Sequence, residues 1–166
     1  FNALVESKET PSDYGTHFDT ISICFSKGLG APVGSVLIGT KDAIIRGKRV
    51  RKALGGGMRQ AGYLAAACTY ALDHHLDKIK DDHRRARILA SAIENLPFVS
   101  AIYPVQTNII IIALKPDRSP QIFLKKLEKK GLLAIGFGKG LIRMVTHLDF
   151  NDAQMEKAIE IFKTLE

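Results

Sequence analysis

The residue best suited to covalent chemistry is Lys27, which follows an apolar segment and begins a loop containing three glycines and a proline. The loop reads Ser-Lys-Gly-Leu-Gly-Ala-Pro-Val-Gly-Ser over residues 26–35. A lysine amine that is buried among apolar side chains loses its proton more readily and can then attack carbonyl carbons. Glycines let a bulky cofactor ring approach the backbone closely. From residue type alone, an exposed turn lysine is the more common alternative.

A second feature is the basic segment at residues 41–59. It holds seven basic side chains and one acid, Asp42, hence a net charge of +6, whereas the whole chain carries +7. Such a segment could bind a phosphate group, an acidic partner or nucleic acid. It lacks interleaved aromatic residues and any known nucleic-acid motif, which argues against nucleic acid. A solvated helix face is the plainest alternative.

A third candidate is Arg143, within the segment Arg-Met-Val-Thr-His-Leu-Asp at residues 143–149. A guanidinium group can bind a carboxylate through two parallel hydrogen bonds, although an arginine at a strand edge is often only a surface residue. His147 is interpreted as a structural hydrogen-bonding residue. His75 and His83 lie about two helical turns apart, too far to hold one ion without further ligands. We expect no metal site.

The elements that position these residues follow from hydrophobic periodicity and from glycine and proline. Strands at residues 19–25 and 34–39 flank the Lys27 loop and suggest a hairpin-like pair or adjacent strands. The helix at residues 60–76 is apolar nearly all round, which indicates burial on most sides. A turn is expected at residues 11–15, further helices at 41–54, 76–95, 119–130 and 151–165, and further strands at 99–103, 108–114, 132–137 and 141–145.

The composition is that of a soluble globular protein, with 166 residues of which 46% are hydrophobic and 25% charged. No segment reaches the roughly 18–20 apolar residues that a membrane helix needs, and no signal peptide is recognised. The two cysteines lie in separate apolar segments, which favours reduced thiols and a cytoplasmic location. Beyond residues 95–98 the expected elements form an α+β unit, an open sheet with two helices on one face.

Four segments together carry a family resemblance. Besides the Lys27 loop and the segment that begins at Arg143, they are Arg51-Lys52 and the run Gly-Gly-Gly-Met-Arg-Gln-Ala-Gly at residues 55–62. In this order and at these spacings, they closely resemble the pyridoxal-phosphate-dependent threonine aldolases of the low-specificity and L-allo-threonine types. Those enzymes belong to the aromatic-amino-acid β-eliminating lyase group of fold-type I. The resemblance covers essentially the whole chain.

The resemblance implies an α/β fold, the C-terminal portion of a fold-type I transferase. Residues 1–96 would then be the C-terminal part of the cofactor-binding large domain with its connecting helices. Residues 97–166 would form the small C-terminal α+β domain.

The resemblance also implies roles for four side chains. Lys27 matches the catalytic lysine that forms a Schiff base with pyridoxal 5'-phosphate. Arg59 matches the arginine that reaches the cofactor phosphate from a neighbouring subunit, and Lys52 is expected to help it. Arg143 matches the arginine that binds the α-carboxylate of the amino-acid substrate, where a fork of donors suits bidentate binding.

The implied reaction is retro-aldol cleavage of L-threonine or L-allo-threonine to glycine and acetaldehyde, in a cytoplasmic homodimer or homotetramer with no nucleic-acid or membrane partner. The family pattern has an Asp-Gly-Ala-Arg segment directly before the Phe-Asn-Ala that begins this sequence, and its Asp holds the pyridine nitrogen. We therefore expect this polypeptide alone to be inactive. Apolar faces on the Cys24 strand and on the helix over 64–72 are expected to be uncovered, with self-association or partial disorder around residues 1–60.

Two alternatives stay open. The cofactor lysine does not fix the reaction, so another pyridoxal-phosphate enzyme, a β-eliminating lyase or a racemase, fits the same motifs. A basic α+β module that binds nucleic acid or an acidic protein would account for the charge at residues 41–59.

Overall fold

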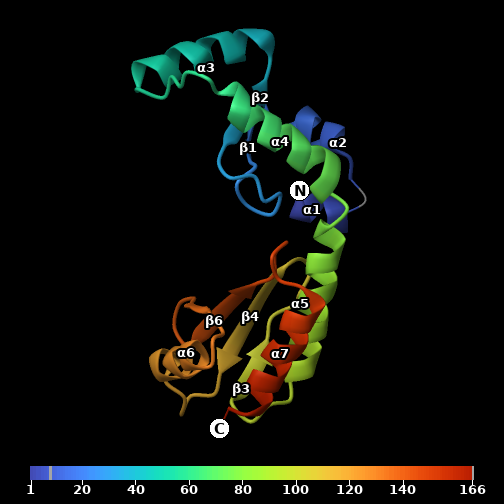
Figure 1. The fold of residues 1–166 in the computed structure, drawn as a ribbon, viewed down its shortest axis with the longest axis vertical. Coiled ribbons are helices and arrows are strands. Elements are labelled where there is room, and N and C mark those ends of the chain that lie inside the picture. Colours follow the sequence, from blue (N-terminus) through green and yellow to red (C-terminus); the bar gives the residue numbers. More distant parts are fainter. Residues whose placement is uncertain (8, 166) are drawn as a thin grey trace. The chain divides into compact units, whose positions relative to one another are not determined.

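The computed structural model of this chain describes residues 1–7 and 9–165. Its residues group into two compact units, Phe1–Asp77 (unit 1) and Lys78–Glu166 (unit 2) (Figure 1). The two domains that the family resemblance implies, with a boundary after residue 96, are not tested by this grouping and stay a prediction. Across the described residues, no helix has the length and apolarity needed to cross a bilayer.

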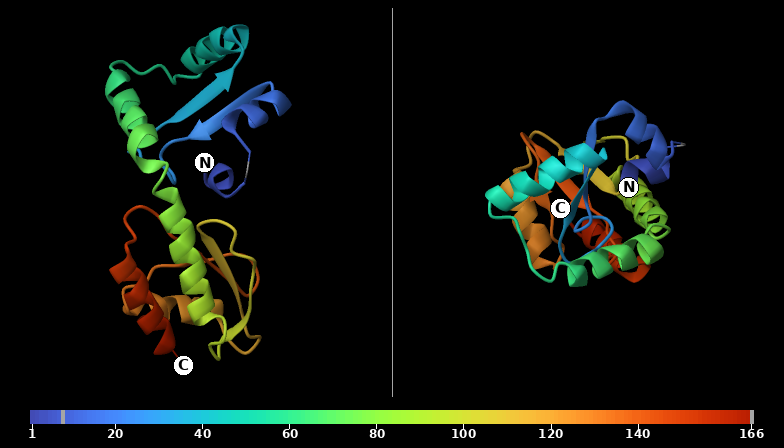
Figure 2. Two further views of the ribbon diagram at one scale, coloured as in Figure 1. Left: turned by 90° about the vertical axis from the view of Figure 1, so that its right-hand side faces the viewer. Right: turned by 90° about the horizontal axis from the view of Figure 1, so that it is seen from above.

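Unit 1 is built around a two-stranded antiparallel sheet. Strand β1 pairs with β2 in a register that runs from Thr20 opposite Gly39 to Cys24 opposite Ser35 (Figure 2), so the predicted hairpin-like pair is confirmed. Helix α3 packs against β2, where a Cβ on Gly47 would lie 3.3 Å from Leu37 Cδ2. The elements are α1 (Asn2–Glu6), α2 (Pro11–His17), β1 (Thr20–Cys24), β2 (Ser35–Gly39), α3 (Lys41–Ala53) and α4 (Gly62–His75).

Helix α2 replaces the turn expected at residues 11–15. Its N-cap is Thr10, whose side chain accepts a hydrogen bond from the N–H of Asp13, while the Asp13 carboxylate accepts one from the N–H of Thr10. Pro11 occupies the first helical position, where its missing N–H costs nothing. This capping box and proline start a helix that the sequence had suggested was only a turn.

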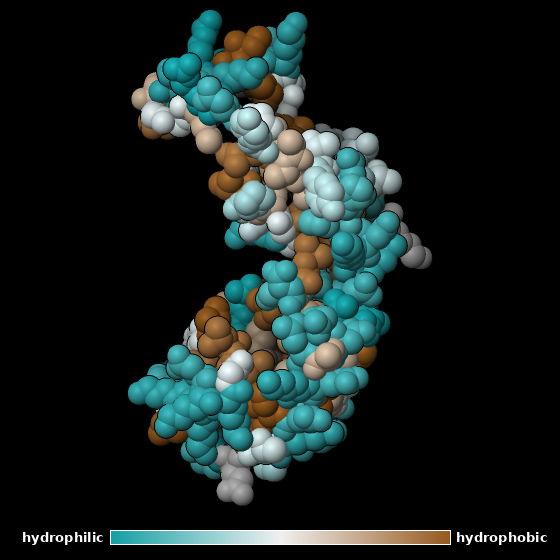
Figure 3. All heavy atoms as spheres, in the orientation of Figure 1, coloured by the Kyte–Doolittle hydropathy of each residue, from teal (hydrophilic) through white to brown (hydrophobic). Residues whose placement is uncertain are grey.

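Apolar side chains reach the surface of unit 1 (Figure 3). All five residues of β2 are exposed, and among them Ile38 is 48% exposed. Helix α4 buries only Ala71, so the prediction that it is buried on most sides is wrong for this chain. A two-stranded sheet offers too little apolar surface to cover such a helix. The expectation of an uncovered apolar face agrees with these exposures for the helix, whereas on the Cys24 strand Ile21 and Ile23 are half-buried.

Unit 2 is a four-stranded antiparallel sheet in the order β3-β4-β6-β5. Helices α6 and α7 share a single core with one face of this sheet, as expected for the segment beyond residue 98, and α5, which precedes that segment, joins the same core. The elements are α5 (Ile79–Ile93), β3 (Val99–Ile102), β4 (Ile109–Leu114), α6 (Pro120–Lys129), β5 (Ile135–Gly136), β6 (Leu141–Val145) and α7 (Asp152–Lys163).

The core of unit 2 follows the alternation of its strands. Along β4 the even-numbered residues Ile110, Ile112 and Leu114 are buried against the helices, and the odd-numbered residues are half-buried on the opposite face. Phe98 and Phe162 are fully buried in the same core, with their ring centroids 6.3 Å apart. The opposite face of the sheet therefore stays open, and it is this face that carries Arg143.

Helices α5 and α7 are also joined by ion pairs. Arg84 Nη2 donates to both carboxylate oxygens of Asp152, at 2.7 and 3.0 Å, and Arg85 Nε donates to Asp152 Oδ1 at 2.6 Å. These hydrogen bonds, from Arg85 and then Arg84, lower the pKa of Asp152 below its ordinary value. Ionised Asp152 therefore stabilises the fold at neutral pH.

We expect this stabilisation to depend on pH. A carboxyl group with a lowered pKa contributes fully above its unfolded pKa, and the contribution is lost as the pH falls through the folded value. The melting temperature of the wild type should therefore exceed that of Asp152→Asn by a constant amount above about pH 5, and the difference should shrink below about pH 4. Thermal unfolding followed by circular dichroism measures both proteins. A difference that does not change with pH would show that the ion pairs contribute nothing.

Candidate active site

The loop that carries Lys27 is closed by its own backbone. The N–H of Phe25 donates to the Gly34 carbonyl at 3.0 Å, and the N–H of Ala31 donates to the Phe25 carbonyl at 3.0 Å. The N–H of Gly30 donates to the Lys27 carbonyl at 2.8 Å. Lys27 therefore lies in a tight turn of fixed backbone rather than in a loose connection.

The neighbours of Lys27 anchor this turn to the rest of unit 1. Phe25 and Leu29 are buried, with Leu29 only 1% exposed, whereas Lys27 between them is exposed. His75 of α4 approaches the loop from one side, with its Nδ1 2.6 Å from the Leu29 carbonyl oxygen. The side chain of Phe1 packs edge-on against Phe25, with ring centroids 6.4 Å apart. Buried residues on both sides hold the turn, but Lys27 itself is exposed, so the burial among apolar side chains that the sequence suggested is not found in this chain.

Two glycines of the loop face side chains from other elements of unit 1. A Cβ on Gly28 would stand 2.7 Å from Asn2 Nδ2, so the Asn2 side chain would have to move to admit one. Gly34 has a φ of +128° and a Cβ on it would lie 3.4 Å from Cys68 Sγ of α4. The sequence suggested that such glycines admit a cofactor ring. In this chain Asn2 and Cys68 occupy the space beside them.

The basic segment forms α3 and the glycine turn that follows it. The N–H of Gly56 donates to the Arg51 carbonyl at 2.8 Å and folds the chain back over the last turn of α3. A Cβ on Gly57 would lie 3.3 Å from Lys52 Nζ, so the Lys52 ammonium group lies against this turn. Arg59 follows two residues later and is exposed. The turn thus presents two cations, Lys52 and Arg59, within a short stretch of chain, which suits binding of a dianion.

Arg143 lies on the open face of the sheet of unit 2. It pairs with Ile111 of β4 on one side and with Ile135 of β5 on the other. Leu141 and Val145 share its face of β6, because side chains alternate along a strand. The arginine is half-buried, and the residues beside it on this face are aliphatic. A carboxylate would bind more strongly in such a setting than at a fully solvated arginine.

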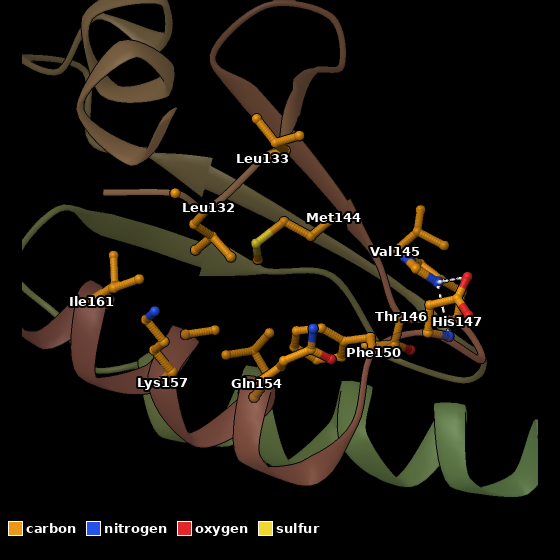
Figure 4. A pocket seen from close by; sticks show the side chains of 14 residues that line it. Leu132, Leu133, Met144, Val145, Thr146, His147, Phe150, Gln154, Lys157 and Ile161 are labelled. Carbon is orange, nitrogen blue, oxygen red and sulfur yellow. Dashed lines mark hydrogen bonds and ion pairs between the residues drawn. The ribbon is translucent and has the colours of Figure 1, made fainter. Parts of the chain in front are cut away.

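The pocket of unit 2 in Figure 4 lies on the other face of β6 and has a volume of about 410 Å³. Its lining is largely apolar, with Lys157 and Gln154 of α7 among the polar residues. His147 accepts a hydrogen bond at Nδ1 from the N–H of Asp149 at 3.3 Å, in keeping with the structural role expected for it. None of the four predicted site residues lines this pocket.

The predicted site residues are divided between the two units. Lys27, Lys52 and Arg59 lie in unit 1, and Arg143 lies in unit 2. Their functional roles stay predictions. The sequence missed a group of buried polar residues in unit 2, to which Asp82 and Thr146 belong. The only sequence signal for it was the position of Thr146 within the Arg143 segment.

The sequence of this chain is similar to those of known proteins. The family model described as beta-eliminating lyase matches residues 1–116. The low-specificity L-threonine aldolase 1 of Arabidopsis thaliana is 36% identical over 148 residues, which cover 87% of this chain and 41% of that protein. The low specificity L-threonine aldolase of Escherichia coli K12 is 34% identical over 155 residues, which cover 93% of this chain and 45% of that protein.

Solved structures share the fold. The ornithine aminotransferase of Toxoplasma gondii, whose structure holds pyridoxal phosphate at partial occupancy, matches with a TM-score of 0.60 and 18% identity over 89% of this chain and 36% of its own. The α/β fold class predicted from the sequence, a portion of a fold-type I enzyme, is confirmed. The chain spans about two fifths of the length of the curated relatives it matches.

Proposed function

The chain belongs to the beta-eliminating lyase family, and from this premise we propose that it is part of a threonine aldolase that uses pyridoxal 5'-phosphate. The proposed reaction cleaves L-threonine or L-allo-threonine to glycine and acetaldehyde. The observation that carries the proposal is the Lys27 turn, in which three backbone hydrogen bonds hold this lysine at a fixed point of the chain. The family relatives of this chain and its likeness to a pyridoxal-phosphate enzyme support the same cofactor.

The residues present fit this cofactor. Lys27 offers an accessible amine for the cofactor aldehyde, and the turn after α3 offers Lys52 and Arg59 for a phosphate dianion. When bound, the cofactor supplies an electron sink that accepts the electrons of the broken Cα–Cβ bond. The protein's part is to hold the aldehyde at a fixed point and to bind the phosphate. Arg59 would do the latter for a neighbouring subunit, so the enzyme would be a homo-oligomer, a dimer or a tetramer.

Arg143 would orient the substrate. Its guanidinium group offers parallel donors to the α-carboxylate, and the aliphatic side chains beside it would strengthen that pairing by excluding water. A substrate held at its carboxylate presents its Cα–Cβ bond in one orientation, and such fixed geometry lowers the barrier to cleavage. Specificity for α-amino acids would follow from this contact.

We further propose that the 166 residues alone are inactive. They span about two fifths of the relatives' length, and Lys27 and strand β2 stay exposed in them. A reacting amine works best where water is excluded. The complete site would need further sequence to cover these surfaces.

The phosphate role of Arg59 is tested by substitution in the full-length enzyme. A charge-assisted hydrogen bond to an anion contributes about 1.5–3 kcal/mol, so Arg59→Gln should raise the Kd for pyridoxal phosphate between about 10- and 100-fold. Absorbance titration of the apoenzyme measures this Kd. Arg46→Gln, in the same basic segment, is the control and should leave the Kd unchanged. An equal rise of the Kd in both variants would mean that only the overall charge of the segment matters, and would contradict the phosphate-binding role of Arg59.

The proposal as a whole is tested against its alternative by a simple comparison. The full-length enzyme with pyridoxal phosphate should release acetaldehyde and glycine from L-threonine or L-allo-threonine. Salt-dependent retention on nucleic acid, with no cleavage of either amino acid, would instead favour the basic interaction module.

A further inference from the structure

Four polar residues that are almost fully buried distinguish the interior of unit 2 from an ordinary apolar core. They are Asp82 and His83 in the first turns of α5, Asn108 directly before β4, and Thr146 directly after β6. Buried polar groups are costly unless they are hydrogen-bonded. Their partners therefore indicate which parts of the fold must be held together.

Thr146 is the centre of this group and is only 2% exposed. Its Oγ1 donates to the Asp82 carbonyl at 2.7 Å and lies 3.4 Å from the Asn108 carbonyl. Its N–H donates to the Asn108 carbonyl at 3.0 Å. Its own carbonyl accepts from Asn108 Nδ2 at 2.8 Å. One residue thus ties the end of β6 both to the start of β4 and to the first turn of α5.

The hydrogen bonds of Thr146 lie at the end of β6, the strand that carries Arg143. The β4–β6 ladder begins with Ile109 opposite Val145, one position inside the pair of Asn108 and Thr146, and it places Ile111 opposite Arg143. Because side chains alternate along a strand, a slip of one residue would turn the guanidinium group from the open face towards the helices. Such a slip would bury the guanidinium group in the apolar core that Ile142 and Met144 now occupy, so the buried face of β6 already sets the register. What Thr146 adds is a hydrogen bond from the end of β6 to α5, outside the sheet.

We propose that Thr146 is a positioning residue: by tying the end of β6 to α5 and β4, its hydroxyl holds Arg143 where the substrate carboxylate binds. This inference rests on the proposed function of Arg143. The hydroxyl links β6 to a helix outside the sheet, because it donates to the carbonyl of Asp82 in α5. The Arg143 segment of the sequence therefore carries a binding residue and, three positions later, the residue that fixes its place.

The test uses Thr146→Val in the full-length enzyme, since valine keeps the shape of threonine and replaces its hydroxyl with a methyl group. The KM for the amino-acid substrate should rise by about tenfold, because small misplacements of binding groups have large effects, while kcat changes by less than about twofold. Thr146→Ser restores the hydroxyl and should return the KM to the wild-type value. Ile93→Val, buried in the same core, controls for lost stability and should leave the KM unchanged.

Spectroscopic titration with glycine, the proposed product, separates this inference from the function on which it rests. If the wild type binds neither pyridoxal phosphate nor glycine, the proposed function fails. If the wild type binds both, and Thr146→Val has wild-type KM and glycine affinity, only the positioning role fails. If the valine variant does not fold, Thr146→Ala, which leaves room for a water molecule at the Asp82 carbonyl, gives the same comparison and the same two outcomes.

Discussion

Substitution of Lys27 by alanine is expected to lower the kcat of the full-length enzyme by about a thousandfold or more, because removal of a covalent-bond-forming residue eliminates the step that it carries. Lys27→Arg should be equally inactive. Arginine keeps the positive charge, but its guanidinium group stays protonated and does not condense with an aldehyde. Both variants should lose the absorbance of the bound cofactor, and steady-state kinetics and a visible spectrum measure the two effects.

A matched control is available within the chain. Lys139 is also exposed and is flanked by Gly138 and Gly140, both with positive φ. Lys139→Ala should leave activity and spectrum unchanged. Retention of activity in Lys27→Ala, or equal losses in the two alanine variants, would show that the turn at residues 26–35 is not where the cofactor is held.

Arg143 is expected to give the second largest effect. Replacement by glutamine should lower kcat/KM by about a hundredfold, the loss expected for a charge-assisted bidentate contact. Replacement by lysine, which keeps the charge but not the fork of donors, should cost about tenfold. Steady-state kinetics with L-threonine or L-allo-threonine measures both variants.

The substrate amide provides the control for Arg143, because it lacks the carboxylate charge. The wild type should discriminate strongly between the acid and the amide, whereas Arg143→Gln should lose most of that discrimination. This comparison isolates the contact between guanidinium and carboxylate, as a double-mutant cycle does. Undiminished preference for the acid in Arg143→Gln would mean that another residue binds the carboxylate.

Local signals in the sequence predicted much of the fold. Strand β1, the glycine loop and β2 follow one another within 20 residues, and their apolar and glycine pattern is unambiguous at that range. The capping box of Asn151 and Gln154 at the start of α7 was likewise readable. The helix predicted at residues 119–130 was signalled by Ser119 and Pro120, and α6 begins there.

What the sequence could not predict depends on contacts between distant segments. Thr146 is hydrogen-bonded to Asp82, 64 positions away in the chain. The spacing of the two residues does not predict that contact. The close approach of Asn2 to Gly28 is of the same kind. These contacts arise from the packing of elements, which local propensity does not encode. The same limit explains α4, whose composition indicates a buried helix although the chain leaves most of it exposed.

The position of the covalent bond between protein and cofactor tests the central claim most directly. The full-length enzyme is loaded with pyridoxal phosphate, reduced with borohydride, digested and analysed by mass spectrometry. We expect the added mass on the peptide that contains Lys27 and on no other lysine. A cofactor that binds but is recovered on a different lysine, or on none, would contradict the account.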